Sequence, residues 1–386
     1  MGQSVSMSLA SRMLELFAWG AVTVGAAAPT VAGTPPGGVE SKSVVFADSH
    51  TDPYDRANLY GLSHAASVTS LGGDRLMAVW FAGPFEGSVH QVLLGAISED
   101  GGKSWGKAKV VNDTPRTSDF DPGFVHAADR LLLFFSNGRW ESNPPQGPGK
   151  KVGVDSFQMF VKASRDGGQT WSEMRDMHTS PGWNSRSNGI RLQDGTLLIP
   201  THHLQYPHKS SVLLSTDDGE TWTRGADITA PDEVGAAEPS VAQLPDGSLL
   251  MVLRTTDGYL WLVRSTDGGK NWSKPERQDL TAATSSANLW TTAKGQVVLT
   301  HNPTKPPERT EMTMRVLAED GKTWSDPLRL AKVEPTADGD ALWNRQISYP
   351  SVCELPDGTL VVVWAFIEQG QVTQRGEIHS TRVRLN

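Results

Sequence analysis

The chain of 386 residues has 35 Lys and Arg against 43 Asp and Glu, and its formal net charge of −8 excludes the dense basic surface that nucleic-acid binding requires. No run of about eighteen apolar residues occurs, so no membrane-spanning helix is expected. The single cysteine, Cys353, excludes an intrachain disulfide, and no Cys and His residues have zinc-site spacing. We therefore expect no metal and no cofactor.

Residues 1–40 differ in composition from the rest of the chain. They contain an early Arg, an apolar stretch and small residues that a signal peptidase could cleave, followed by the flexible sequence GTPPGG at 33–38. Glu15 interrupts the apolar stretch, so a disordered or mis-started N-terminus is the alternative. We expect a secreted or periplasmic protein, with a cytoplasmic location left open, and a single folded domain over residues 41–386.

Six short apolar segments, each preceded by a tight turn, follow along the chain. Asp-Gly between apolar runs is a strong hairpin signal, because Gly tolerates the positive φ of such turns. The segments are GGDRLMAVW (72–80), ADRLLLFF (128–135), QDGTLLIP (193–200), PDGSLLMVL (245–253), KGQVVLTH (294–301) and PDGTLVVVW (356–364).

A second repeat runs in phase with these hairpins. Its copies are SEDGGKSW (98–105), SRDGGQTW (164–171), STDDGETW (215–222), STDGGKNW (265–272) and a degraded AEDGKTW that ends at Trp324. A period near fifty residues indicates an array of like modules. Six four-stranded units without helical periodicity predict an all-β, six-bladed β-propeller, and the strand KSVVFADS at 42–49 is available to close the ring. Because the octet recurs in the blades alike, we interpret it as a folding clasp whose terminal Trp enters the blade's hydrophobic layer.

These octets resemble the Asp boxes of sialidases, also called neuraminidases, and of the broader BNR-repeat propellers. The resemblance covers about residues 60–386. Sialidases share three arginines that bind the sugar carboxylate, a Tyr nucleophile paired with a Glu, and an acid/base Asp. Such an arrangement implies an exo-glycosidase that acts on glycans with a terminal acidic sugar.

Four of these positions are carried over from matching segments. The segment AAEPSVAQLPDGSLLMVLRTTDG is similar to the one with the Glu and the second Arg, which gives Glu238 and Arg254. NPTKPPERTEMTMRV resembles the segment with the third Arg and gives Arg309, and SYPSVCELPDGTLV gives Tyr349 as the nucleophile. Arg forks bind carboxylates bidentately, and a Tyr nucleophile avoids the repulsion that a carboxylate nucleophile would meet.

The first blade departs from the family pattern. Where the family has its first Arg, this chain has SHAASV, which places His64 there, and the acid/base position falls on Glu86 in FAGPFEGSVHQ. Glu can make the same proton transfer, whereas His64 could hold a carboxylate through one bond only if protonated, or take part in acid/base catalysis. Arg186 in NSRSNG is a further cation that could approach the axis in place of the missing Arg.

The sequence thus leads to a retaining, sialidase-like exo-glycosidase with Tyr349, Glu238 and Glu86 as catalytic residues. Arg254, Arg309 and His64 are the substrate-binding candidates. Two alternatives stay open: an enzyme that acts on uronic or ulosonic acid sugars, and a propeller that binds glycan or protein without catalysis. The oligomeric state cannot be inferred from the sequence.

Overall fold

The computed structural model describes residues 37–139, 156–231, 234–333, 345–370 and 373–386. Within these ranges every regular element is a β-strand, and no helix is long and apolar enough to cross a membrane. The candidate signal sequence lies almost entirely outside the described residues.

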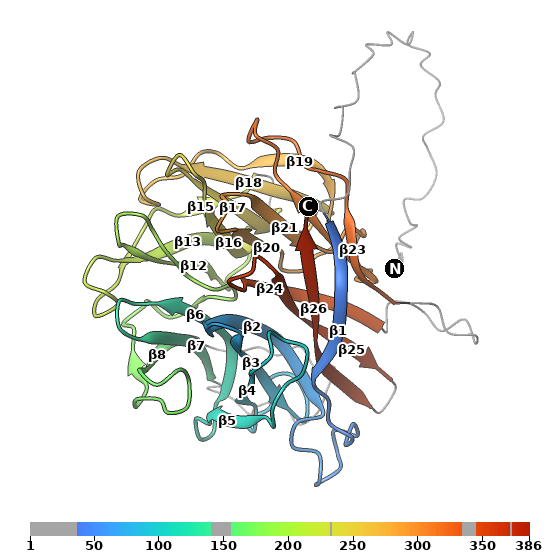
Figure 1. Ribbon diagram of the computed structural model, residues 1–386. Helices are drawn as coiled ribbons and strands as arrows, with labels where there is room; N and C mark the ends of the chain where they lie inside the picture. The colour runs from blue at the N-terminus through green and yellow to red at the C-terminus, as the bar shows by residue number, and fades with distance from the viewer. Residues whose placement is uncertain (1–36, 140–155, 232–233, 334–344, 371–372) are drawn as a thin grey trace, which may run out of the picture. The chain divides into compact units, whose positions relative to one another are not determined.

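The strands form six antiparallel sheets, which we number as blades in chain order (Figure 1). Blades one to three consist of β2 (Leu62–Gly72), β3 (Arg75–Gly83), β4 (Val92–Ser98) and β5 (Lys109–Asn112); β6 (Ser118–His126), β7 (Leu131–Arg139), β8 (Ser156–Ser164) and β9 (Arg175–Asp176); and β10 (Trp183–Asn184), β11 (Ile190–Arg191), β12 (Leu197–His203), β13 (Lys209–Ser215), β14 (Thr223–Arg224) and β15 (Ile228–Thr229). Blades four to six consist of β16 (Ala237–Gln243), β17 (Leu249–Arg254), β18 (Tyr259–Ser265) and β19 (Glu276–Thr281); β20 (Asn288–Thr291), β21 (Val297–His301), β22 (Glu311–Val316) and β23 (Leu328–Lys332); and β24 (Arg345–Glu354), β25 (Leu360–Gln369), β26 (Gln374–Leu385) and β1 (Gly37–Phe46).

The first and last strands of the chain pair with each other. β1 runs antiparallel to β26, from Gly37 opposite Leu385 to Phe46 opposite Ile378, and Figure 1 shows the two strands side by side. This pairing confirms that the N-terminal strand completes the last blade. The strand starts at Gly37, before the predicted domain boundary at residue 41, so the two glycines that end GTPPGG belong to the sheet.

Six hydrophobic layers hold the ring together, and each layer lies between two neighbouring blades. One joins blades six and one around Trp80 and Val363, and the next joins blades one and two around Phe81 and Phe135. The remaining four follow in order around the ring, and the last joins blades five and six. Every blade therefore buries both of its faces, which confirms the closed six-bladed propeller.

The Asp boxes form compact turns between the third and fourth strands of their blades. In blade one, Ser98 Oγ donates to Asp100 Oδ1 at 2.8 Å, and the amide of Ser104 donates to the same oxygen at 2.9 Å. The Ser104 hydroxyl also donates to the Asp100 carboxylate and has the largest effect on it. Together these hydrogen bonds lower the pKa of Asp100 to about 2. Gly101 and Gly102 have φ of 72° and 82°, values that residues other than glycine rarely adopt. The box aspartates are thus used in turn formation.

The Trp that ends each box packs between blades. Trp105 lies against the layer of blades six and one, and its Nε1 donates to Ser380 Oγ of blade six at 3.2 Å. The corresponding tryptophans of the next four boxes each pack between their own blade and the preceding one: Trp171, Trp222, Trp272 and Trp324. The clasp interpretation is extended by this finding, because the box fastens neighbouring blades as well as its own turn.

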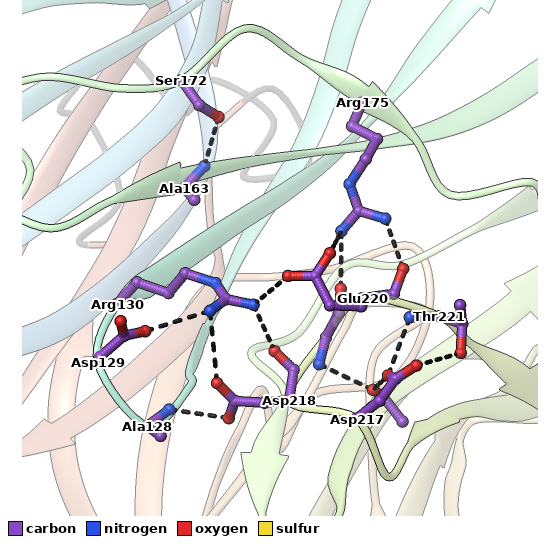
Figure 2. Close-up of polar contacts among 12 residues, drawn as sticks. Ala128, Asp129, Arg130, Ala163, Ser172, Arg175, Asp217, Asp218, Glu220 and Thr221 are labelled. Atoms are coloured by element: carbon purple, nitrogen blue, oxygen red, sulfur yellow. Dashed lines mark hydrogen bonds and ion pairs between the residues drawn. The ribbon is translucent and has the colours of Figure 1, made fainter.

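Arginines of blade two reinforce the box of blade three, as Figure 2 shows. Arg130 Nη2 donates to the carbonyl of Asp218 at 2.9 Å and to Glu220 Oε1 at 2.6 Å. Arg175 Nη2 donates to the carbonyl of Gly219 at 2.7 Å. Asp218 occupies a position where three of the other boxes have Gly and has φ of 59°. Its Oδ1 accepts from the amide of Ala128 at 2.8 Å, which helps to hold this conformation.

Replacing Trp272 by alanine is expected to lower the free energy of unfolding by about 2–4 kcal/mol, because it empties part of the layer between blades three and four. Trp272 is partly buried, and its Nε1 donates to the carbonyl of Gly269 at 3.1 Å. Urea denaturation of Trp272→Ala beside Lys270→Ala, an exposed change in the same turn, measures the effect. The lysine change should stay within about 0.5 kcal/mol. Equal stabilities of the two variants would show that the Trp is not a clasp residue.

Candidate active site

The first strands of four blades carry a bulge at which a non-glycine residue has positive φ. These residues are Ala65 (54°) in β2, Asp121 (48°) in β6, Glu238 (38°) in β16 and Tyr349 (59°) in β24. Each coincides with a register shift between the first and second strands of its blade. Such conformations are uncommon for non-glycine residues and concentrate at functional sites.

Tyr349, Glu238 and Arg254 form one hydrogen-bonded cluster across the centre of the ring. The Tyr349 hydroxyl donates to Glu238 Oε1 at 3.1 Å, although the two residues lie in blades six and four. Arg254 Nη1 donates to the same carboxylate oxygen at 2.5 Å and to the Tyr349 hydroxyl oxygen at 2.9 Å. Arg254 reaches both because it ends β17 opposite Ala237, the neighbour of Glu238. The structure therefore brings three of the predicted residues into contact.

The charges of this cluster follow from burial and pairing. Burial would raise the pKa of Glu238, but Arg254 beside it and His202 outweigh that effect and lower it to about 2. Burial raises the pKa of Tyr349 to about 12, against the opposing effect of Arg254. At neutral pH Glu238 is therefore a carboxylate that accepts a hydrogen bond from the protonated Tyr349 phenol. Its second oxygen, Oε2, is buried and has no hydrogen-bond partner among the described residues.

Arg309 faces the same ring from blade five. Its guanidinium carbon lies 5.7 Å from the centroid of the Tyr349 ring, and its Nη2 donates to the carbonyl of Thr284 at 2.5 Å. The side chain is partly buried in the segment just before β22. Arg254 and Arg309 thus present two guanidinium groups around Tyr349.

His64 lies against the nucleophile candidate but carries no charge at neutral pH. Its ring meets that of Tyr349 edge-on, with centroids 4.5 Å apart and an interplanar angle of 70°. Burial, together with the nearby charges of Arg309 and Arg186, lowers the pKa of His64 to about 3. Without a bound ligand the imidazole is therefore neutral near neutral pH and forms an uncharged wall beside Tyr349, while its role in substrate binding stays a prediction.

Glu86 lies in the segment between β3 and β4 and contributes a carboxyl group to the site. The residue is exposed, and its carboxyl group interacts electrostatically with Arg309, Glu238 and Arg254. The partial loss of solvent around this carboxyl group raises the pKa of Glu86. The segment is held by Gln91, whose Oε1 accepts from the amide of Gly87 at 2.9 Å.

Asp121 is a site residue that sequence reasoning missed. Burial raises its pKa to about 7, against the opposing effect of Arg186, and its Oδ2 accepts from Asn184 Nδ2 at 2.7 Å. A signal was present in the repeat: Asp121, Glu238 and Tyr349 each precede a Pro at the bulge of a first strand. The shared position in three alternate blades, two, four and six, could have identified Asp121.

Blade three contributes Arg186 and His202. Arg186 is 1% exposed and does approach Tyr349, but both hydrogen bonds of its Nη2 go to backbone carbonyls, those of Ala66 at 3.2 Å and Tyr349 at 3.1 Å. His202 is buried, and burial lowers its pKa to about 4 despite the nearby charge of Glu238. Within the described residues, no group of three or more His, Cys, Asp and Glu side chains could hold a metal ion.

The chain has clear relatives among proteins with this architecture. A sialidase from Micromonospora viridifaciens is 28% identical over 301 residues, which cover 69% of this chain and 44% of that protein. A structure of a Dyadobacter fermentans protein of unknown function superposes with a TM-score of 0.70 at 19% identity, over 92% of this chain and all of the other. NanB sialidase from Streptococcus pneumoniae, as its K499G mutant, gives 0.64 at 12% identity, over 90% and 70%.

These comparisons define the family and its common fold. At sequence identities of 19% and 12%, the structural likeness shows a shared propeller fold. The chain spans about half the length of the curated sialidases that it matches, such as those of Micromonospora viridifaciens and Bacteroides fragilis strain YCH46. The BNR repeat-like domain family matches residues 74–362, most of the chain. The protein therefore belongs to the BNR repeat-like domain family and shares the propeller of the sialidase superfamily.

Proposed function

We propose that this protein is a retaining exo-glycosidase that removes a terminal acidic sugar of the sialic acid class, with Tyr349 as its nucleophile. The observation that carries the proposal is the hydrogen-bonded cluster of Tyr349, Glu238 and Arg254. The naming of its relatives as sialidases supports the same reaction. The substrate is a glycan or glycoconjugate, and the composition of residues 1–40 favours a location outside the cytoplasm.

The proposed first step forms a covalent bond between the sugar and the enzyme. Glu238 takes the phenol proton as the Tyr349 oxygen attacks the anomeric carbon and the bond to the leaving oxygen breaks. Glu86 protonates that leaving oxygen, which departs as an alcohol. A water molecule then attacks the same carbon, gives a proton to Glu86 and releases the sugar, while the phenolate recovers its proton from Glu238. Two inversions leave the anomeric configuration retained.

The two guanidinium groups suit the carboxylate of the substrate. Arg254 uses Nη1 for both Glu238 and Tyr349, and Arg309 uses Nη2 for a backbone carbonyl, so each has another terminal nitrogen to offer. A guanidinium fork binds a carboxylate more strongly than an ammonium point charge does. A Tyr nucleophile is neutral before attack, which avoids repulsion from the adjacent carboxylate of the sugar.

The neutral His64 supports a second candidate within the same class of reaction. It stands where sialidases have their first carboxylate-binding Arg, so the site offers a less cationic wall than the family pattern does. The alternative substrate is a uronic acid, whose carboxylate lies away from the anomeric carbon, or a deoxy-ulosonic acid, which has its carboxylate on the anomeric carbon but differs in the rest of the sugar. The hydrogen bond between Tyr349 and Glu238 favours an enzyme over a propeller that binds glycan without catalysis.

Turnover of a panel of fluorogenic glycosides tests the proposed function. The panel contains an α-sialoside, a deoxy-ulosonide, a β-glucuronide and a neutral β-galactoside, and it is assayed with wild type and Tyr349→Phe. We expect the wild type to hydrolyse the sialoside and to ignore the galactoside. Binding of the free acidic sugars without any hydrolysis by the folded protein would support the binding module instead.

Arg309→Lys is expected to raise KM for the acidic substrate by about tenfold with a smaller change in kcat, because the lysine replaces a fork with a point charge. Steady-state kinetics measure both constants. A control, Arg224→Lys, alters a partly exposed arginine of blade three that pairs with Asp227. An unchanged KM in the Arg309 variant would remove Arg309 from substrate binding.

A further inference from the structure

The first strand of blade three is divided into two short strands, whereas each of the other blades has one continuous first strand. β10 ends at Asn184 and β11 begins at Ile190, and each pairs with a different part of β12. The intervening residues, 185–189, leave the ladder and are fixed by side-chain bonds. Ser185 Oγ donates to the carbonyl of Pro200 at 2.6 Å, which ties the segment to its own blade.

Side chains of the same segment also donate to or accept from the backbone of blades one, two and six. Asn188 Nδ2 donates to the carbonyl of Val68 in blade one at 2.8 Å, and its Oδ1 accepts from the amide of Phe124 in blade two at 2.9 Å. Arg186 extends further and reaches blades one and six through its Nη2. The interruption thus allows blade three to place a buried arginine at the centre of the ring.

The two carbonyl groups that receive Arg186 belong to bulges. Ala66 follows the positive-φ residue Ala65 and lies in the register shift between His64 and Ser67. Tyr349 lies in the shift between β24 residues 348 and 351. A bulge leaves backbone groups without a ladder partner, and Arg186 satisfies one carbonyl in each of the two strands. It therefore stabilises the unusual backbone that aims Tyr349 at Glu238.

The guanidinium of Arg186 also lies over the ring of Tyr349. Its Cζ is 4.9 Å from the ring centroid, within the range of a cation–π interaction. Arg186 interacts electrostatically with Asp121, Glu238 and Tyr349, and its buried Nε has no hydrogen-bond partner in the part of the chain that the structure describes. Being 1% exposed and bonded to main chain, it faces the nucleophile from the protein side and offers little surface to a ligand.

We propose that Arg186 is a positioning residue for Tyr349, which holds the main chain of the nucleophile in place and stabilises the phenolate as it forms. The catalytic consequence rests on the proposed function. Arg254 acts at the phenol oxygen and Arg186 at the ring face and backbone, so the negative charge that develops on attack is stabilised from two sides. Arg186 replaces the missing arginine of blade one in charge, and it serves the nucleophile rather than the substrate carboxylate.

Among the described residues, the other charged and titratable groups that act most strongly on Tyr349 or touch its ring are Arg254, Glu238, Arg309, Asp121 and His64. None of them changes in an Arg186 variant. His64 is neutral at assay pH and adds no charge of its own.

Kinetics of Arg186→Met and Arg186→Lys test the positioning role. We expect Arg186→Met to lower kcat by about 100-fold or more while KM changes by less than about threefold, and Arg186→Lys to recover part of kcat. The control is Arg382→Met, which removes another buried arginine, 7% exposed, that donates to the carbonyl of Gly101 in a neighbouring blade. A raised KM with unchanged kcat, or an equal loss of kcat in the Arg382 variant, would overturn the proposal.

A titration that needs no turnover tests the same coupling directly. A fluorinated tyrosine at position 349 has a more acidic phenol, whose ionisation is followed by absorbance in a protein that stays folded. We expect Arg186→Met to raise the pKa of this phenol by about one to two units, because a unit charge at this distance is removed. Arg186→Lys, which keeps the charge, should shift it less and also provides the test if the Met variant does not fold.

The two experiments separate the possible failures. If no acidic glycoside is hydrolysed but the phenol titration shifts as expected, the proposed function fails and the coupling between Arg186 and Tyr349 stands. If the wild type is active and the titration is the same in both Arg186 variants as in wild type, the positioning role is wrong while the proposed function remains.

Discussion

Tyr349→Phe is expected to lower kcat by about 10³-fold or more, because phenylalanine keeps the shape of the ring and removes the attacking oxygen. Affinity for the acidic sugar should stay within a few-fold of wild type, since Arg254 and Arg309 remain in place. The loss of the hydroxyl also removes one acceptor of Arg254 Nη1, which keeps its bond to Glu238. Stopped-flow and steady-state assays on the fluorogenic sialoside measure the effect.

Tyr259→Phe, a change of a partly buried tyrosine in β18, is the matched control and should retain full activity. A Tyr349→Phe enzyme with more than about a tenth of wild-type kcat would contradict a role for Tyr349 as nucleophile. Thermal unfolding of both variants establishes that any loss comes from chemistry rather than from the fold.

Glu238→Gln is expected to give the second large loss, about 10²- to 10⁴-fold in kcat, because the amide cannot take the phenol proton. This change also leaves Arg254 without its buried counter-ion. Removal of one partner of a buried ion pair costs about 3–5 kcal/mol, and the site retains some solvent access, so the lower end of that range applies. The loss of kcat should therefore come with a measurable loss of stability.

The pH dependence of stability distinguishes this variant further. The folded-state pKa of Glu238 is about 2, below its ordinary value of 4.5, so the pair contributes stability above pH 4.5 that is lost as the pH falls to about 2. Wild type should accordingly lose stability over this interval more steeply than Glu238→Gln. Parallel curves for the two proteins would show that Glu238 is not held as a paired carboxylate.

The fold could be predicted from the sequence because its information is local and repeated. Each Asp box fixes a turn through its own side chains, and each Asp-Gly hairpin has a short-range signal. The recurrence of both at a period near fifty gave the number of blades, and the spare N-terminal strand gave the closure. The packing of the box tryptophans between blades could not be predicted in this way, since nothing in one repeat specifies its neighbour.

The site was predictable only in part, for a related physical reason. Glu238, Arg254, Arg309 and Tyr349 came from resemblance to sialidases, and the structure brings them together. Asp121 and the contacts of Arg186 depend on which residues meet across the centre of the ring. Arg186 binds carbonyl groups 120 and 163 residues away, which no local pattern encodes.

The charge of His64 could not be read from the sequence either. A histidine at the position of a family arginine could be a cation or a neutral ring, and burial decides between the two. Burial also explains the pKa of Asp121, which is raised above its ordinary value mainly because the carboxyl group loses contact with solvent. Burial of this kind depends on the assembled blades rather than on any one segment.

Covalent trapping of the sugar on the enzyme tests the central claim most directly. The protein is incubated with an activated fluorinated sialosyl fluoride, which reacts quickly with a nucleophile and leaves it slowly, and intact mass and peptide mapping locate the adduct. The account predicts a single adduct on the oxygen of Tyr349 in wild type and none in Tyr349→Phe. Hydrolysis of the reagent by wild type without an adduct, or an adduct on another residue, would contradict it.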